Sequence, residues 1–477
     1  MRSNTPAGID SIIEQDADQL VETVAESVRI PSVLGPAKPG KPFGAEVDRA
    51  LEHALGVAER FGFEVGRLEG YAGWVDLGSG DELIGVLSHV DVVPAGKTSD
   101  WNHPPFGAEI VDGVMVGRGT ADDKGPLFSV LYGMKAIRDA RLPLTKRMRL
   151  LLGTNEESGW GGIRRYLETE ELPARGFSPD GMFTVVNREK GISVLRLVGT
   201  DRTRAAEGMR LGSVHGGTAP NSVPDEAIAR IEGASSLMPR IQQAMDEAMK
   251  QRSSASFSLD VQDEGGVHIR STGRAAHAMN PEQGSNAIAE LLHLLRALDL
   301  VEDGATRFVA LLDEHIGFDT TGTSLGMGWR DDPSGALTLN LGQIEIDRGE
   351  AVAVLDIRSP VSIACQEVID QVGKVFENGS DSLRVEIQKQ NEPLYVPEEH
   401  PLIKTLTAVY ERVTGRESVL HAIGGGTYAR AIDNCVCFGA VYPDEEITVH
   451  RPNERASIEK MIQNAKVYGH ALYELAQ

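Results

Sequence analysis

Apolar side chains recur along the chain at two spacings, and each spacing predicts a different element. Amphipathic helices are predicted where these side chains lie three or four positions apart, at residues 12–28, 47–61, 126–140, 163–169, 402–413 and 458–475. Short continuous apolar runs predict buried strands, at residues 63–68, 73–77, 84–90, 148–152, 182–186 and 435–441. Strands that alternate with helices in this way predict an α/β fold with a mostly parallel sheet.

The pattern changes in the middle of the chain. Residues 257–261 and 267–271 alternate between apolar and polar side chains, which predicts strands, and residues 235–251 and 286–298 carry helical spacing. No strand–helix–strand rhythm is visible there. The sequence therefore predicts an α+β domain at residues 191–385, inserted into an α/β domain that comprises residues 1–190 and 386–477.

Polar residues stand where the predicted strands end. His89 and Asp91 close the strand at 84–90, and side chains two positions apart on a strand project to the same side. Both can therefore face one site, with His89 as a metal ligand and Asp91 as the carboxylate that orients its ring. Asp122 and Asp123 lie three to four positions before the start of the helix predicted at 126–140. Taken alone, such a doublet is usually only a helix cap.

Five side chains at such positions predict a site for two metal ions: His89, Asp122, Glu157, Asp180 and His450. Their oxygen and imidazole ligands suit zinc, and also manganese or cobalt. Two metals about 3.5–4 Å apart need a bridging ligand, and Asp122 is the best candidate because Gly119 and Gly125 can hold its backbone. In the Glu156–Glu157 doublet one acid can bind metal while the other acts as general base. The alternative for this doublet is a charge pair at a helix start.

Six motifs in order carry a resemblance that covers nearly the whole chain: SHVDVVP, GRGTADDKG, GTNEESG, SPDG, GGGTYAR and VHRPNE. They resemble the co-catalytic di-zinc exopeptidases that include aminoacylase and carboxypeptidase G, and above all the PepV-like dipeptidase branch. The resemblance implies that His89, Asp122 and Asp180 hold one metal and that Asp122, Glu157 and His450 hold the other. It implies Glu156 as general base, Asp91 as orienter of His89, and a cis peptide between Asp122 and Asp123. It also implies that the insertion is a lid domain of two lobes.

The resemblance extends to a substrate-binding set: Asn221, His277, Arg358, Gly425, Gly426 and Thr427. An imidazole or amide N–H near the scissile carbonyl stabilises the developing oxyanion, which suits His277 and Asn221. The fork of Arg358 can bind the free C-terminal carboxylate of a peptide, and the glycine loop can add backbone N–H donors. Singly, each has an ordinary alternative: a surface histidine, an asparagine turn and an arginine ion pair.

Composition narrows the classes of function. The formal net charge of −23 argues against nucleic acid and anionic membrane surfaces as partners. Three cysteines cannot form a disulfide framework, which predicts a reducing cytoplasmic location. The N-terminal residues contain no apolar core of a signal peptide, and no apolar run has the length of a membrane span.

The sequence thus predicts a cytoplasmic dipeptidase that hydrolyses short unblocked peptides with a free C-terminal carboxylate. The expected mechanism is attack by a metal-activated hydroxide with Glu156 as general base. One alternative keeps this chemistry with another acyl group, as an N-acyl-amino-acid deacylase or desuccinylase. A second alternative is a metal-dependent binding protein without catalysis, which would have no need of Glu156. The resemblance also implies a monomer, because the insertion of the PepV-like branch is large enough to form two lobes, one of which takes the place of a partner subunit.

Overall fold

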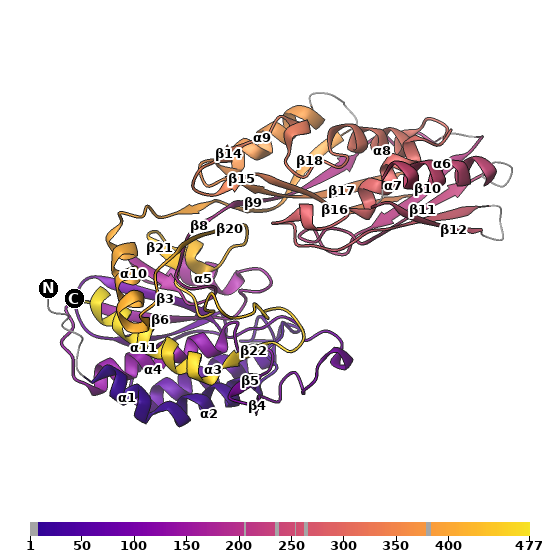
Figure 1. The fold of residues 1–477 in the computed structure, drawn as a ribbon. Coiled ribbons are helices and arrows are strands. Elements are labelled where there is room, and N and C mark those ends of the chain that lie inside the picture. Colours follow the sequence, from indigo (N-terminus) through magenta and orange to yellow (C-terminus); the bar gives the residue numbers. More distant parts are fainter. Residues whose placement is uncertain (1–7, 205–206, 234–237, 253, 262–265, 378–382) are drawn as a thin grey trace. The chain divides into compact units, whose positions relative to one another are not determined.

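The chain folds into two compact units (Figure 1). The computed structural model describes residues 8–204, 207–233, 238–252, 254–261, 266–377 and 383–477. The first unit comprises the chain up to Asn187, Tyr395–His421 and Gly426–Gln477, and the second comprises Arg188–Leu394 and Ala422–Gly425. The chain returns to the first unit at Tyr395 rather than at the expected residue 386. The reason is that strand β18 (Leu383–Asn391) pairs with β9 (Gly191–Gly199) inside the second unit.

A nine-stranded sheet forms the centre of the first unit. Its order is β1 (Glu64–Leu68), β2 (Ala72–Leu77), β6 (Arg147–Gly153), β3 (Leu83–His89), β7 (Arg175–Ser178), β21 (Cys435–Cys437), β8 (Val185–Glu189) and β19 (Leu394–Tyr395), with β20 (Leu420–Ile423) on β8. The four central strands, β6 to β21, are parallel, whereas β1–β2, β2–β6 and β21–β8 are antiparallel. The predicted α/β class is confirmed. The parallel core matters for function because it places the carboxyl ends of β3, β6 and β7 at one edge.

Helices cover this sheet: α1 (Ile9–Gln15), α2 (Ala17–Val28), α3 (Ala45–Phe61), α4 (Lys124–Asp139), α5 (Gly161–Thr169), α10 (Pro401–Thr414) and α11 (Ile458–Leu475). The single helix predicted at 12–28 is two helices, divided at Asp16. Helices α4 and α11 pack against each other at two glycines. A Cβ atom on Gly133 would lie 2.8 Å from the backbone nitrogen of Gly469, so the crossing requires a residue without a side chain. Among the described residues no helix is both long and apolar enough to span a membrane.

A small sheet joins two distant parts of the first unit. Strand β5 (Val114–Val116) pairs with β4 (Glu109–Val111) on one side and with β22 (Arg455–Ser457) on the other. Strand β5 is followed by the loop that carries Asp122, and β22 is preceded by the segment that carries His450. The β5–β22 pairing therefore brings these two segments together.

The second unit is built on one antiparallel sheet. The order is β12 (Ser256–Val261), β13 (Val267–Thr272), β11 (Glu226–Glu232), β10 (Arg210–Gly216), β16 (Thr338–Asp347), β17 (Glu350–Ser359), β9 and β18. The pairing of β10 with β16 joins its two halves, so the two lobes expected for the insertion share a continuous sheet. Its helices are α6 (Met238–Gln251), α7 (Ala287–Arg296), α8 (Gly304–His315) and α9 (Cys365–Phe376), and a short hairpin is formed by β14 (Arg330–Asp331) and β15 (Gly335–Ala336). Residues 235–237 of the helix expected at 235–251 lie outside the described residues.

Candidate metal centre and active site

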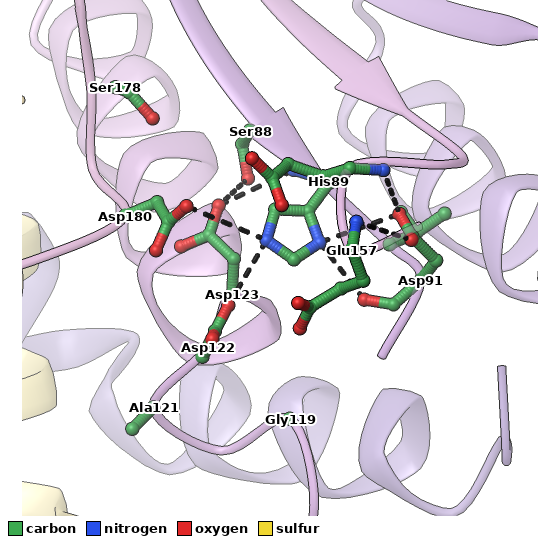
Figure 2. Close-up of polar contacts among 12 residues, drawn as sticks. Ser88, His89, Asp91, Gly119, Ala121, Asp122, Asp123, Glu157, Ser178 and Asp180 are labelled. Carbon is green, nitrogen blue, oxygen red and sulfur yellow. Dashed lines mark hydrogen bonds and ion pairs between the residues drawn. The ribbon is translucent and has the colours of Figure 1, made fainter. Parts of the chain in front are cut away.

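His89 stands at the end of the buried strand β3, where its ring is fixed from both sides (Figure 2). Its Nδ1 lies 2.9 Å from the main-chain oxygen of Asp91, to which it donates. Its Nε2 lies 3.1 Å from Oδ1 of Asp122 and 3.9 Å from Oδ2 of Asp180. A proton held on Nδ1 leaves the lone pair of Nε2 directed at these two carboxylates. That is the tautomer and orientation which a metal ligand needs.

Asp122 places one oxygen toward each of the two candidate histidines. Its Oδ1 faces His89, and its Oδ2 lies 2.9 Å from Nε2 of His450. The same nitrogen of His450 lies 3.1 Å from Oε2 of Glu157. Burial alone would raise the pKa of Asp122, but the neighbouring imidazoles of His450 and His89 lower it overall. A carboxylate shared in this way has the arrangement of a bridging ligand.

Asp91 contacts the loop after β6 more closely than it contacts the ring of His89. Its Oδ1 and Oδ2 accept the backbone N–H groups of Glu156 and Glu157, each at 3.1 Å. By contrast, Oδ1 lies 3.5 Å from Nδ1 of His89, which already donates to the main-chain oxygen. Asp91 therefore orients the ring through its backbone, and its carboxylate fixes the position of the two glutamates.

Buried carboxyl groups are crowded together at this edge of the sheet. Burial is the main reason why the pKa of Glu156 rises to about 8 and that of Asp123 to about 7, and it raises the pKa of Asp180 well above its usual range. Neighbouring carboxylates add to the shifts of Glu156 and Asp180. Carboxylates buried this close together are stabilised by a cation. Two sets of ligand atoms lie within 4.8 Å of one another: those of His89, Asp122 and Glu157, and those of His89, Glu156 and Asp180.

Asp123 holds β3 in place beside the site, a role that sequence reasoning missed. Its Oδ2 accepts a hydrogen bond of 2.5 Å from Oγ of Ser88 and lies 3.4 Å from the backbone nitrogen of His89. It makes no side-chain cap to α4, so the helix-cap interpretation does not apply to its carboxylate. The peptide between Asp122 and Asp123 is cis, as the motif resemblance implies.

In the second unit, the loops that carry Asn221 and His277 are joined edge to edge. The backbone of Ala278 donates to the oxygen of Asn221 at 2.9 Å, and that of Val223 donates to the oxygen of Ala276 at 2.8 Å. Both predicted side chains are exposed. The backbone of Met279 donates to Nδ1 of His277 at 3.1 Å, so in the neutral ring the N–H lies on Nε2.

Two residues of β16 hold these loops, and the sequence contained no signal for either. The side-chain amide of Asn340 donates to the oxygens of Pro220 and Ser222, both at 2.9 Å. These two residues flank Asn221. Thr338, two positions earlier on the same strand, contacts the oxygen of Ala278 at 3.2 Å. Such a role depends on which loop a strand residue meets, and no local motif encodes that.

Arg358 is buried and already holds two partners in the second unit. Its Nε and Nη2 contact the two carboxylate oxygens of Asp356 at 2.5 and 2.7 Å, and Nη1 donates to the oxygen of Gly424 at 2.9 Å. Three of the five N–H groups of the guanidinium are thus engaged. Arg358 therefore does form an ion pair, with Asp356. Its binding of a substrate carboxylate stays a prediction.

The glycine loop divides between the units. Gly425 belongs to the second unit, whereas Gly426 and Thr427 belong to the first. Oγ1 of Thr427 accepts the backbone N–H of Ala429 at 3.2 Å and so caps a short 3-10 helix, Tyr428–Ala431. The predicted contacts of these three residues with substrate stay predictions.

Comparison with known proteins gives the family of the chain. Residues 85–474 match peptidase family M20/M25/M40. "Putative dipeptidase YtjP" of Bacillus subtilis (strain 168) is 37% identical over 465 residues, which cover 96% of this chain and 98% of that protein. A relative from Staphylococcus haemolyticus (strain JCSC1435), "Putative dipeptidase SH1171", is 32% identical over 471 residues and covers 97% and 98%.

Solved structures share the fold at lower identity. Human carnosine dipeptidase 1 has a TM-score of 0.58 at 16% identity, with 98% of this chain and 99% of that chain covered. The M20 family metallo-carboxypeptidase Sso-CP2 from Sulfolobus solfataricus has a TM-score of 0.59 at 16% identity, with 96% and 99% covered. The structural likeness supports the fold, and the sequence match over most of the chain supports the family. The chain therefore belongs to peptidase family M20/M25/M40, as its motifs predicted.

Proposed function

We propose that this peptidase is a di-metal dipeptidase which hydrolyses short unblocked peptides with a free C-terminal carboxylate. The observation that supports it most is the position of Asp122, with one oxygen 3.1 Å from Nε2 of His89 and the other 2.9 Å from Nε2 of His450. A carboxylate between two imidazoles is the arrangement expected for two metals bridged by one ligand. His89, Asp122 and Asp180 would hold one ion, and Asp122, Glu157 and His450 the other.

The donor set suits divalent cations of the zinc, manganese and cobalt type, with zinc preferred. When bound, two such cations would lower the pKa of a coordinated water and polarise the peptide carbonyl. Glu156 takes the proton of the attacking water and passes it to the nitrogen as the C–N bond breaks. Its backbone N–H donates to the buried carboxylate of Asp91, which fixes the position of Glu156 beside the proposed metal site.

The second unit would supply the contacts that select a dipeptide. The N–H on Nε2 of His277 suits stabilisation of the oxyanion, with the amide of Asn221 nearby on the joined loop. The N–H groups of Arg358 not engaged by Asp356 and Gly424 would bind the C-terminal carboxylate. The relatives designated as dipeptidases support this substrate class over N-acyl amino acids.

Hydrolysis by the purified protein tests the substrate. The protein is loaded with zinc, manganese or cobalt and assayed on unblocked dipeptides, on the same dipeptides amidated at the C-terminus, and on N-acetyl and N-succinyl amino acids. We expect turnover of the unblocked dipeptides and little of the amidated ones. Faster turnover of the N-acyl compounds would identify a deacylase instead. Metal binding without hydrolysis of any compound would favour the alternative of a metal-dependent binding protein without catalysis.

The glutamate doublet tests the division of roles. Glu156→Gln should keep both metals and lower turnover by about 10²–10⁴-fold, since only proton transfer is lost. Glu157→Gln should lower metal content, because this residue contacts His450 at the site. Metal content is measured by atomic emission on gel-filtered protein. Equal metal loss in both variants would contradict the assignment.

We propose further that each chain completes its own site as a cytoplasmic monomer. The second unit carries the loops of Asn221 and His277 on a sheet of two joined halves, one of which would take the place of a partner chain, and a lid must close to exclude water. Mixing inactive Glu156→Gln with inactive His277→Ala protein should restore no activity. Recovery in the mixture, or loss of specific activity on dilution, would show that partner chains share residues.

A further inference from the structure

Glu454 lies beneath the loop that carries Asp122 and is completely buried. Its Oε1 accepts the backbone N–H groups of Gly119 at 3.0 Å, Ala121 at 3.0 Å and Asp122 at 3.2 Å. Figure 2 shows these three loop residues in sequence below His89. One carboxylate oxygen thus fixes three peptide groups of a single loop, a concave arrangement of N–H donors that suits an anion.

The second carboxylate oxygen of Glu454 and its main chain also contact the segment that precedes Asp122. Oε2 of Glu454 lies 2.5 Å from Nη1 of Arg118, which is itself buried. The main-chain oxygen of Glu454 accepts the N–H of Gly117 at 2.9 Å, and the following residue, Arg455, starts the β22 pairing with Val116. Glu454 is therefore tied to the Asp122 loop through its side chain and its backbone.

The same residue lies four positions after His450. The intervening turn contains two non-glycine residues in the left-handed region, His450 and Asn453, each with φ of 61°. Oγ1 of Thr448 accepts the N–H of Arg455 across this turn at 3.2 Å. A displacement of Glu454 would therefore move the segment of His450 as well as the loop of Asp122.

We propose that Glu454 is a positioning residue that fixes the distance between Asp122 and His450, and so sets the affinity for metal. This inference rests on the proposed di-metal site. Glu454 does not touch substrate or metal in this role; it acts through the backbone of residues 119–122. Outer contacts of this kind change metal affinity by about 10–100-fold when they are removed.

Substitution of Glu454 by an amide tests this directly. In Glu454→Gln only one oxygen accepts, so it can face either the three N–H groups or Arg118, but not both. Glu454→Asp keeps the charge but is one methylene shorter, and it cannot reach both partners at hydrogen-bond distance. Asp76→Asn is the control, because it makes the same change from carboxylate to amide in an arginine ion pair of the same unit, with Arg149 at 2.7 Å, away from the proposed metal ligands.

Metal-stripped proteins are titrated with Zn²⁺ or Mn²⁺ alone by calorimetry, and kcat and KM for a dipeptide are measured at limiting and at excess metal. We expect both Glu454 variants to bind at least one ion about 10–100-fold more weakly than native protein, with KM unchanged and kcat partly restored by excess metal. Asp76→Asn should bind metal normally. If Glu454→Gln does not fold, Glu454→Asp provides the same comparison.

Native affinity in the Glu454 variants, or a loss no larger than that in Asp76→Asn, would overturn the inference. Failure of the native protein to bind two ions would instead refute the proposed di-metal site. The two failures are distinguished because the first is read from the variants and the second from the native protein.

Discussion

Asp91→Asn tests whether the carboxylate of Asp91 acts mainly on the loop of the two glutamates. In the native protein its two oxygens each accept one backbone N–H at 3.1 Å, from Glu156 and Glu157. An asparagine has one accepting oxygen, so one of these N–H groups would face an NH₂ group. The side chain is buried, with 3% of its surface exposed, and water cannot replace the lost acceptor.

The expected loss of stability follows from the number of hydrogen-bond acceptors that each substitution removes. Leaving one buried N–H without an acceptor costs about 1–3 kcal/mol, so the free energy of unfolding of the metal-free protein should fall by that amount. Asp91→Ala removes both acceptors and should cost more. The ring of His89 should keep its position, since Nδ1 donates to the main-chain oxygen of residue 91 in all three proteins. Because Glu156 and Glu157 lose their fixed position, kcat should fall by about 10–100-fold.

Urea unfolding of metal-free protein, followed by far-UV circular dichroism, measures the change in stability. Asp81→Asn is the control, because it makes the same chemical change at an exposed position of the first unit. If Asp91 acted only on the ring of His89, the amide oxygen of asparagine could still accept from it and stability would hardly change. An Asp91→Asn midpoint equal to that of Asp81→Asn would refute the reasoning.

Two further predictions concern the stability of the first unit, one through helix packing and one through pH. Gly133→Ala should lower the free energy of unfolding by about 1–3 kcal/mol, because the new Cβ would lie 2.8 Å from the backbone nitrogen of Gly469. Gly56→Ala is the control: its Cβ would meet only a side-chain atom at 3.8 Å, and it should instead raise the free energy of unfolding by about 0.4–1 kcal/mol. Thermal melts that fail to separate the two variants would contradict the close crossing of α4 and α11. Asp10 tests how stability depends on pH. The hydrogen bond from His470, at 2.8 Å, lowers the pKa of Asp10. The contribution of this pair to the free energy of unfolding is therefore fully present above the ordinary pKa of about 3.9 and is lost as the pH falls below that value. Asp10→Asn should therefore be less stable than native protein near neutral pH and converge with it below about pH 3.9, and a difference in urea midpoint that does not change with pH would contradict this.

The sequence was sufficient for the elements that carry the site. Helix α11 spans the predicted residues Ile458–Leu475, and the apolar run at 84–90 is strand β3 with His89 at its end. Burial imposes a period on the side chains of an element, and that period can be read locally. The proposed ligands Asp122 and Glu157 were recognisable for a related reason, since each stands in a short motif next to such an element.

Only the tertiary structure decided which groups hold these residues in place. Glu454 accepts the N–H of Gly119 across 335 positions of sequence, and Asn340 holds the loop of Asn221 from a strand in the other half of the same sheet. The carboxylate of Asp91 accepts two peptide N–H groups in addition to lying 3.5 Å from the ring of His89, and the spacing predicted only the contact with the ring. A hydrogen bond depends on distance and angle to within a few tenths of an ångström. The packing of distant segments sets that geometry, and the period of one segment contains no information about it.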